Sequence, residues 1–163
     1  MVFDCDKMKP KCKACCCAPT PMPKEIFERN RDKIARLVIE ELYFNGPLLD
    51  EESFKNPRGV LEGPMVVAVG EPDLGETNQR CPFLTKEWKC NIYEDRPFVC
   101  REFGKESHLM MKCRFQDKDG RVRSRQDMRQ IDRKQCRGAH ALHDKVMTNE
   151  DRTPIKLQIV KED

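Results

Sequence analysis

Hydrophobic residues recur with helical spacing over residues 23–44 of the chain. Apolar side chains three and four residues apart share one face there, and arginine and glutamate side chains occupy the opposite face. The sequence Asn-Gly-Pro at positions 45–47 ends the pattern, because glycine and proline favour helix termination. The pattern predicts a long amphipathic helix over residues 23–44. Its apolar positions are Ile26, Phe27, Ile34, Leu37, Val38 and Leu42.

A second stretch with the same spacing runs from Ser124 to Val146. Serine is one of the residues that cap helix N-termini, so Ser124 marks the expected start. Three arginines at intervals of four, Arg125, Arg129 and Arg133, lie on one face. The pattern predicts a second long amphipathic helix. Its other face carries Met128, Ile131, Gln135, Ala139, Leu142 and Val146.

Three further segments have the character of strands rather than helices. Residues 65–69 are a β-branched apolar run between a proline and a glycine, as in a short buried strand. Residues 154–160 alternate apolar and polar positions, as in a half-buried strand. Residues 81–93 predict a hairpin that carries a cysteine on each arm and turns through residues 85–88.

These elements predict an α+β fold, a small irregular domain with two long amphipathic helices and a few short strands. Leu, Ile, Val and Phe make up about a fifth of the 163 residues, close to the composition below which chains stay disordered. Ten cysteines accompany this lean core. We therefore expect the fold to be centred on a metal site. Residues 1–103 are the expected cysteine-cluster metal-binding region, and residues 104–163 a basic helical extension packed on the same domain.

Charge and hydropathy argue against several classes of protein. The net charge is only +3 although 36% of the residues are charged, so the chain as a whole is not a polyelectrolyte. No apolar run approaches the ~20 residues that span a bilayer, and the N-terminus lacks the apolar segment of a secretory signal. These features predict a cytoplasmic protein without a membrane partner. In that compartment, clustered cysteines serve more often as metal ligands or redox groups than as structural disulfides.

The N-terminal cysteines form the first group of candidate ligands. Cys12 and Cys15 stand in a CxxC pair, whose spacing lets two thiolates of one tight turn bind one metal ion. The adjacent Cys16 and Cys17 leave the backbone in different directions, so simple geometry lets at most one of them join this pair. A redox dithiol is the alternative interpretation of CxxC. It expects a helix that starts at the motif, and prolines follow here instead.

The second group of candidate ligands comes from the predicted hairpin and the turn after it. The arms of the hairpin bring Cys81 and Cys90 together, and Asp-Arg-Pro at 95–97 leads into a short helix that carries Cys100. Arg96 and Arg101 flank this site and suit the negative charge of a thiolate centre. The candidate metal ligands are Cys12, Cys15, Cys16, Cys17, Cys81, Cys90 and Cys100. They suffice for one tetrahedral ion, for two ions that share thiolates, or for an iron–sulfur cluster.

The strings CPFL from residue 81, KCNIY from residue 89 and RPFVCREF from residue 96, preceded by clustered N-terminal cysteines, closely resemble the YkgJ-like cysteine-cluster family. The signature of that family is CxxCxxCC, and a similar cluster occurs in flagellin lysine N-methylases. The resemblance covers residues 5–103 and implies a domain that chelates zinc or iron. This chain departs from the signature at the N-terminus, where it has CxxCCC and Lys9 stands at the position of the first cysteine.

Metal binding is therefore the predicted function, with zinc or iron as the cofactor and a metal ion as the expected partner. Two alternatives stay open. The methylase resemblance motivates a metal-dependent protein-modifying enzyme, for which no catalytic residue is identified. The basic face of residues 121–137 motivates a module that binds a protein or a nucleic acid, the nucleic acid being disfavoured by the small net charge. Cys5, Cys113 and Cys136 remain unassigned, and which of Cys5, Cys16 and Cys17 joins the N-terminal ligands stays open.

Overall fold

A computed structural model describes residues 12–14, 17–48, 50–55, 61–105 and 111–135 of the chain. The chain divides into two compact units. The first spans Lys13–Arg101 and is called the sheet unit below. The second, the C-terminal unit, begins at Glu102 and includes Cys12. Each unit is described by itself.

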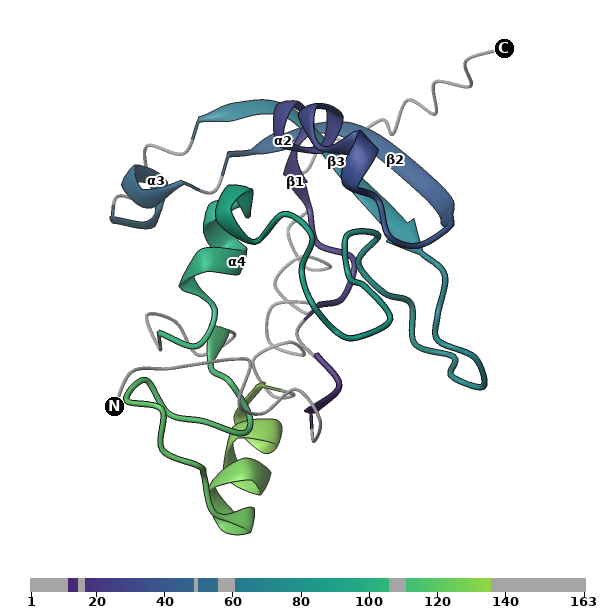
Figure 1. Cartoon of the computed structure of the whole chain (residues 1–163). Coiled ribbons are helices and arrows are strands. Elements are labelled where there is room, and N and C mark those ends of the chain that lie inside the picture. The colour runs from purple at the N-terminus through teal and green to yellow at the C-terminus, as the bar shows by residue number, and fades with distance from the viewer. Residues whose placement is uncertain (1–11, 15–16, 49, 56–60, 106–110, 136–163) are drawn as a thin grey trace, which may run out of the picture. The chain divides into compact units, whose positions relative to one another are not determined.

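A three-stranded antiparallel sheet forms the framework of the sheet unit (Figure 1). The strands are β1 (Met22–Pro23), β2 (Val38–Pro47) and β3 (Glu62–Gly70). Their order is β1-β3-β2, so β3 is the central strand. Val66 of β3 lies opposite Met22 on one side and Tyr43 on the other. The predicted strand over residues 65–69 is confirmed and is longer than the apolar run that predicted it.

The predicted helix over residues 23–44 is correct only for its first turns. Helix α2 covers Lys24–Arg29, a 3-10 turn follows at Arg31–Lys33, and the chain then enters β2. The central strand β3 has backbone groups on both sides that need hydrogen-bond partners, and β2 supplies them on one side. The β-branched and aromatic residues of β2 fit this pleated, half-buried surface. The prediction was therefore wrong because pairing with a strand outside the segment overrode its helical spacing.

Asn30 marks the end of α2. Its side chain is buried, and its Nδ2 donates to the carbonyl oxygen of Ile26 at 2.9 Å and to the carboxylate of Asp95. Its backbone N–H donates to the carbonyl oxygen of Phe27 at 3.2 Å. Arg29 also binds the carboxylate of Asp95, with Nε at 2.7 Å from Oδ2. The end of α2 is thus tied to the segment that leads toward Cys100.

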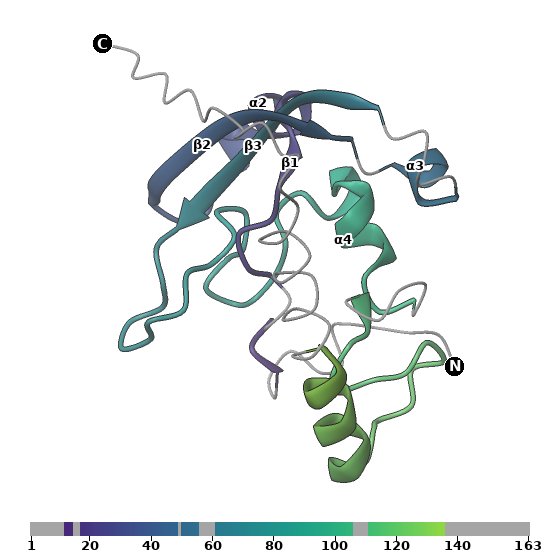
Figure 2. The same ribbon diagram turned by 180° about the vertical axis from the view of Figure 1, so that it is seen from behind.

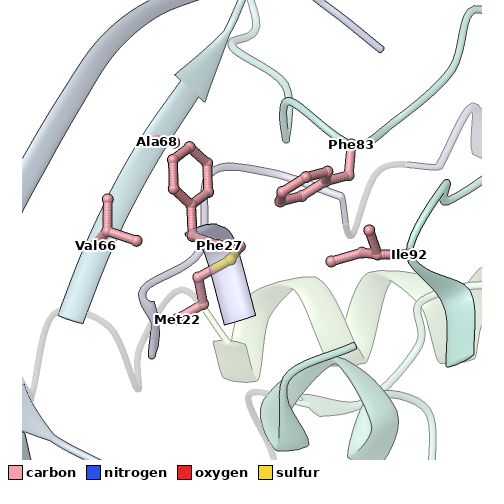
Figure 3. Packing of buried hydrophobic residues seen from close by; sticks show 6 residues of the cluster. All are labelled: Met22, Phe27, Val66, Ala68, Phe83 and Ile92. Carbon is pink, nitrogen blue, oxygen red and sulfur yellow. The ribbon is translucent and has the colours of Figure 1, made fainter. Parts of the chain in front are cut away.

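The apolar core of the sheet unit lies between α2, the sheet and the loop after β3 (Figure 3). Phe27 of α2 and Phe83 of the loop are fully buried and meet edge to face, with ring centroids 5.7 Å apart. Figure 2 shows α2 against the sheet from the opposite side. Cys81 and Cys90 are among the partly buried side chains that pack against this core. The buried members of the core cluster are Met22, Phe27, Val66, Ala68, Phe83 and Ile92.

The C-terminal unit contains a helix whose described part covers residues 125–135. Ser124 caps it as predicted: its Oγ accepts from the N–H of Asp127 at 3.1 Å, and the carboxylate of Asp127 accepts from the N–H of Ser124 at 3.2 Å. Ile131 is buried, whereas the predicted basic positions Arg125 and Arg129 are exposed. The rest of the predicted helix, to residue 146, and the predicted strand over 154–160 lie outside the described residues.

The overall class is α+β, with helices and a small sheet. Two long amphipathic helices are not found in the described residues, because the first predicted helix is divided among α2, a 3-10 turn and β2. The helix over 125–135 is the only long one in those ranges. Within the same ranges, no helix has the length and apolar character needed to cross a lipid bilayer.

Candidate metal centre

The loop after β3 contains a turn with Cys81 and Cys90 near its two ends. Leu84 pairs with Cys90 in a single antiparallel bridge, and the N–H of Asn91 donates to the carbonyl oxygen of Phe83 at 2.9 Å. The N–H of Thr85 donates to the carbonyl oxygen of Lys89 at 2.8 Å and closes the turn. The predicted hairpin is therefore confirmed as a turn with a cysteine near each end. Its predicted arms are reduced to one bridge and do not extend into strands.

Cys100 lies on a short helix, as predicted. A 3-10 turn covers Tyr93–Asp95, and helix α4 covers Phe98–Glu102. The carbonyl oxygen of Pro97 accepts from the N–H of Cys100 at 2.9 Å. Proline lacks an N–H, and its fixed φ favours the first turn of a helix. Pro97 therefore favours the start of α4 directly before Cys100.

Cys17 joins these cysteines from the N-terminal side. Its carbonyl oxygen accepts from the N–H of Cys81 at 3.0 Å, and its own N–H donates to the carbonyl oxygen of Ala14 at 2.8 Å. Lys13 and Ala14 have φ of 48° and 50°, the left-handed conformation that residues other than glycine adopt only rarely. A tight turn therefore precedes Cys17 and brings it beside Cys81.

The thiols of Cys17, Cys90 and Cys100 are near enough to Cys81 to act on it electrostatically. Burial, together with the charges of Cys17, Cys100 and Cys90, raises the pKa of Cys81 to about 12, although a backbone hydrogen bond at Phe83 lowers it. Burial also raises the pKa of Cys100 to about 12, together with the charges of Cys17 and Cys90, while Arg96 lowers it. Such thiols stay protonated near neutral pH unless a cation compensates the charge of their thiolates.

Arg96 is the positively charged side chain that lowers the pKa of Cys100. Its guanidinium lies over the ring of Tyr93 at 3.7 Å from the centroid, and its Nε donates to the carbonyl oxygen of Tyr93 at 2.8 Å. Arg101, the other arginine predicted to flank the centre, is exposed and lies over the ring of Phe98 at 6.0 Å. The two contacts with Tyr93 position the guanidinium of Arg96, whose positive charge lowers the pKa of Cys100.

Two buried arginines were not among the predicted site residues. Arg36 fastens the loop: its Nε donates to the carbonyl oxygen of Leu84 at 2.6 Å, its Nη2 donates to that of Thr85 at 3.1 Å, and its Nη1 lies 2.8 Å from the carboxylate of Asp73. Arg80 binds the N-terminal cysteine segment. Arginines are usually exposed, and the sequence carries no signal that these two are buried. The only available hint was that Arg80 directly precedes Cys81.

The seven predicted ligands do not all lie in the same part of the structure. Cys17, Cys81, Cys90 and Cys100 come together in the sheet unit. Cys12 belongs to the C-terminal unit, and Cys15 and Cys16 lie outside the described residues. Within the described ranges, no three histidine, cysteine, aspartate or glutamate side chains already form a ligand set for a metal ion. The four thiols therefore lie near enough to act on one another electrostatically, but their side chains do not form a ligand set as they stand.

The chemistry of these donors fits zinc or iron. Four thiolates match the tetrahedral coordination of zinc and the ligation of an iron–sulfur cluster, whereas magnesium and calcium prefer oxygen ligands. Cys81 and Cys90 are partly buried against the core, and reduced contact with water strengthens the attraction between thiolates and a cation.

Comparison with known proteins gives one result. A family model with the description "CxxCxxCC: Putative zinc- or iron-chelating domain" matches residues 4–150. No curated protein and no solved structure gives a significant match.

Proposed function

Because this chain belongs to the CxxCxxCC family of zinc- or iron-chelating domains, we propose that it binds a metal ion through the thiolates of four cysteines in the sheet unit. The proposed ligands are Cys17, Cys81, Cys90 and Cys100. The observation that carries the proposal is the main-chain hydrogen bond that places Cys17 beside Cys81, in a turn that also carries Cys90. Cysteines that are distant in sequence and close in space are typical of metal sites built by the fold.

The backbone supports this assignment independently of the thiol groups. The hydrogen bond between Cys81 and Cys17 joins two of the three segments, and the bridge between Leu84 and Cys90 fixes the separation within the loop. The N-terminus of α4 fixes the position of Cys100.

The four thiols suit a single zinc ion or an iron–sulfur cluster. When bound, either group supplies the positive charge that keeps buried thiolates deprotonated. Cys15 and Cys16 are further proposed ligands, since they stand directly before Cys17 in the chain. They provide the additional thiolates that a second ion would require. Cys12 remains a predicted ligand.

The metal content of the full-length protein tests the proposal. Protein purified without oxygen is expected to contain zinc or iron in a fixed ratio to the chain. Iron with broad visible absorption identifies an iron–sulfur cluster, and colourless protein with zinc identifies a zinc site. Replacement of Cys81 or Cys100 by serine is expected to lower the metal content severely. Cys113→Ser is the matched control, because Cys113 is a buried free thiol of the C-terminal unit. Full metal content in both ligand variants would contradict the proposal.

A further inference from the structure

Arg80 connects the end of β3 to the cysteine loop. Its N–H donates to the carbonyl oxygen of Gly70 at 3.2 Å, and its carbonyl oxygen accepts from the N–H of Gly70 at 2.8 Å. The end of β3 and the segment from Arg80 to Pro82 approach so closely that a Cβ on Gly70 would lie 3.0 Å from the carbonyl oxygen of Arg80 and 3.0 Å from the Cα of Pro82. The backbone of Arg80 is therefore held rigidly against the sheet, one residue before Cys81.

The side chain of Arg80 turns toward the N-terminal cysteine segment and is only 8% exposed. Its Nη1 donates to the carbonyl oxygen of Lys13 at 3.1 Å and to that of Ala14 at 3.5 Å. Its Nη2 donates to the carboxylate of Glu76 at 2.7 Å, and its Nε lies 3.7 Å from the carboxylate of Asp73. One guanidinium thus joins two backbone carbonyls to two carboxylates, which a single lysine ammonium cannot do with the same geometry.

The carbonyls bound by Arg80 belong to the strained part of the segment. Lys13 and Ala14 both have left-handed φ, and such conformations persist where the surrounding structure holds them. The Nζ of Lys13 also reaches the carboxylate of Glu76 at 3.3 Å, so a second ion pair supports the same turn. The turn ends at Cys17, whose N–H is bound by the carbonyl oxygen of Ala14.

We propose that Arg80 is a positioning residue of the metal centre: it holds the turn at Lys13 and Ala14 so that Cys17 lies beside Cys81 before the metal binds. This inference rests on the proposed metal-binding function. Arg80 does not touch the metal ion itself. Its effect passes through backbone carbonyls, and the loss of such a supporting contact typically weakens metal affinity about 10- to 100-fold.

The experiment is an anaerobic titration of the metal-free, full-length protein with Co²⁺, followed by competition with Zn²⁺. Absorption from thiolate-to-cobalt charge transfer, divided by the cobalt bound, reports how many thiolates ligate each ion. In Arg80→Gln we expect Co²⁺ affinity to fall about 10- to 100-fold and the absorption per bound cobalt to decrease as Cys17 leaves the ligand set. A merely stabilising residue would change the unfolding midpoint and leave this absorption unchanged.

Arg31→Gln is the matched control. Arg31 also binds two carboxylates of the sheet unit, those of Glu28 and Glu41, and it contacts neither Lys13 nor Ala14. It should keep the affinity and spectrum of the wild type. If Arg80→Gln fails to fold, Glu76→Gln keeps the guanidinium and removes a charge that orients it. We expect this variant to show the same change in a milder form.

The outcomes separate the two proposals. Wild-type affinity and wild-type absorption per cobalt in Arg80→Gln, or in Glu76→Gln where the former does not fold, would contradict the role of Arg80 and leave metal binding intact. A wild-type protein that shows no thiolate-to-cobalt charge transfer and no competition by Zn²⁺ would contradict the proposed function, and the role of Arg80 would fail with it. Reduced affinity and reduced absorption in the Arg80 variant alone would support both.

Discussion

The carbonyl oxygen of Cys17 accepts a hydrogen bond from the backbone N–H of Cys81 at 3.0 Å. This contact joins the N-terminal cysteine segment to the loop after β3, although all three strands of the sheet lie between the two residues in sequence. Main-chain geometry therefore brings these two cysteines together without any bond between sulfur atoms. The assembly of the candidate metal centre is consequently part of the folding of the sheet unit, and substitutions in that fold should affect it.

Phe83 is the side chain that connects the cysteine loop most directly to the core. Phe83 lies between Cys81 and Cys90 in the sequence. Its side chain is fully buried and packs against the ring of Phe27. Phe83→Ala is expected to lower the free energy of unfolding by about 3–5 kcal/mol, because it removes a large buried ring and leaves a cavity. Urea unfolding followed by circular dichroism measures this change. Leu74→Ala is the control, since Leu74 is fully exposed, and its effect should stay below about 0.5 kcal/mol. Similar effects of the two substitutions would refute the assigned packing.

Asp95 makes stability depend on pH in the acid range. The carboxylate binds Arg29 and Asn30, and Lys33 adds a favourable charge, so its pKa falls to about 2. Because the folded-state pKa lies below that of an unfolded aspartate, about 3.9, the stabilisation is complete above roughly pH 4 and is lost as the pH falls toward 2. The side chain is 34% exposed, so solvent screening limits the contribution to about 1 kcal/mol.

The difference in urea-unfolding free energy between wild type and Asp95→Asn isolates this carboxylate. It should be about 1 kcal/mol at pH 6 and should shrink toward pH 2. Glu25→Gln serves as the control, because Glu25 is 86% exposed and meets the same Arg29 only at 3.5 Å. A difference between wild type and Asp95→Asn that does not change with pH would show that the ion pair contributes nothing.

Ser124 stabilises the start of the helix over 125–135 through its reciprocal contacts with Asp127. Ser124→Ala removes the acceptor for an otherwise unpaired helix N–H and should destabilise the helix by about 1 kcal/mol. Faster hydrogen exchange of the amides in the first turn is the expected result. Gln126→Ala changes an exposed neighbour in the same turn and should leave exchange unaltered or slower, since alanine favours helix. Equal exchange in Ser124→Ala and wild type would show that the cap is unimportant.

The sequence predicted local features well where local chemistry decides them. The proline before α4, the cap at Ser124 and the β-branched run of β3 each specify their element within a few residues. The segment over 23–44 could not be predicted in this way. Its apolar spacing fits a helix, and most of its apolar residues do pack on the core, but the partner strand β3 lies far along the chain. Only the folded sheet decides between the two conformations.

The candidate site shows the same division. Clustering and resemblance identified the cysteines, whereas geometry assigned Cys17 to the neighbourhood of Cys81, which CxxC spacing alone did not favour. The two arginines Arg96 and Arg80 differ in the same way, since one was predicted from the sequence and the other was not. Arg96 was expected to flank the site because it lies four residues before Cys100 in the sequence. Arg80 could not be predicted, because its partners Lys13 and Ala14 come from a distant segment.

The central claim is that sulfur atoms of cysteines of the sheet unit bind the metal ion. X-ray absorption spectroscopy of the metal-loaded, full-length protein tests it most directly. For a zinc site, we expect a first shell of four sulfur atoms at about 2.3 Å, and for iron a first shell that also contains sulfur only. Cys81→Ser should lose metal or replace one sulfur by a lighter atom. A first shell dominated by nitrogen or oxygen in the wild type would contradict the account.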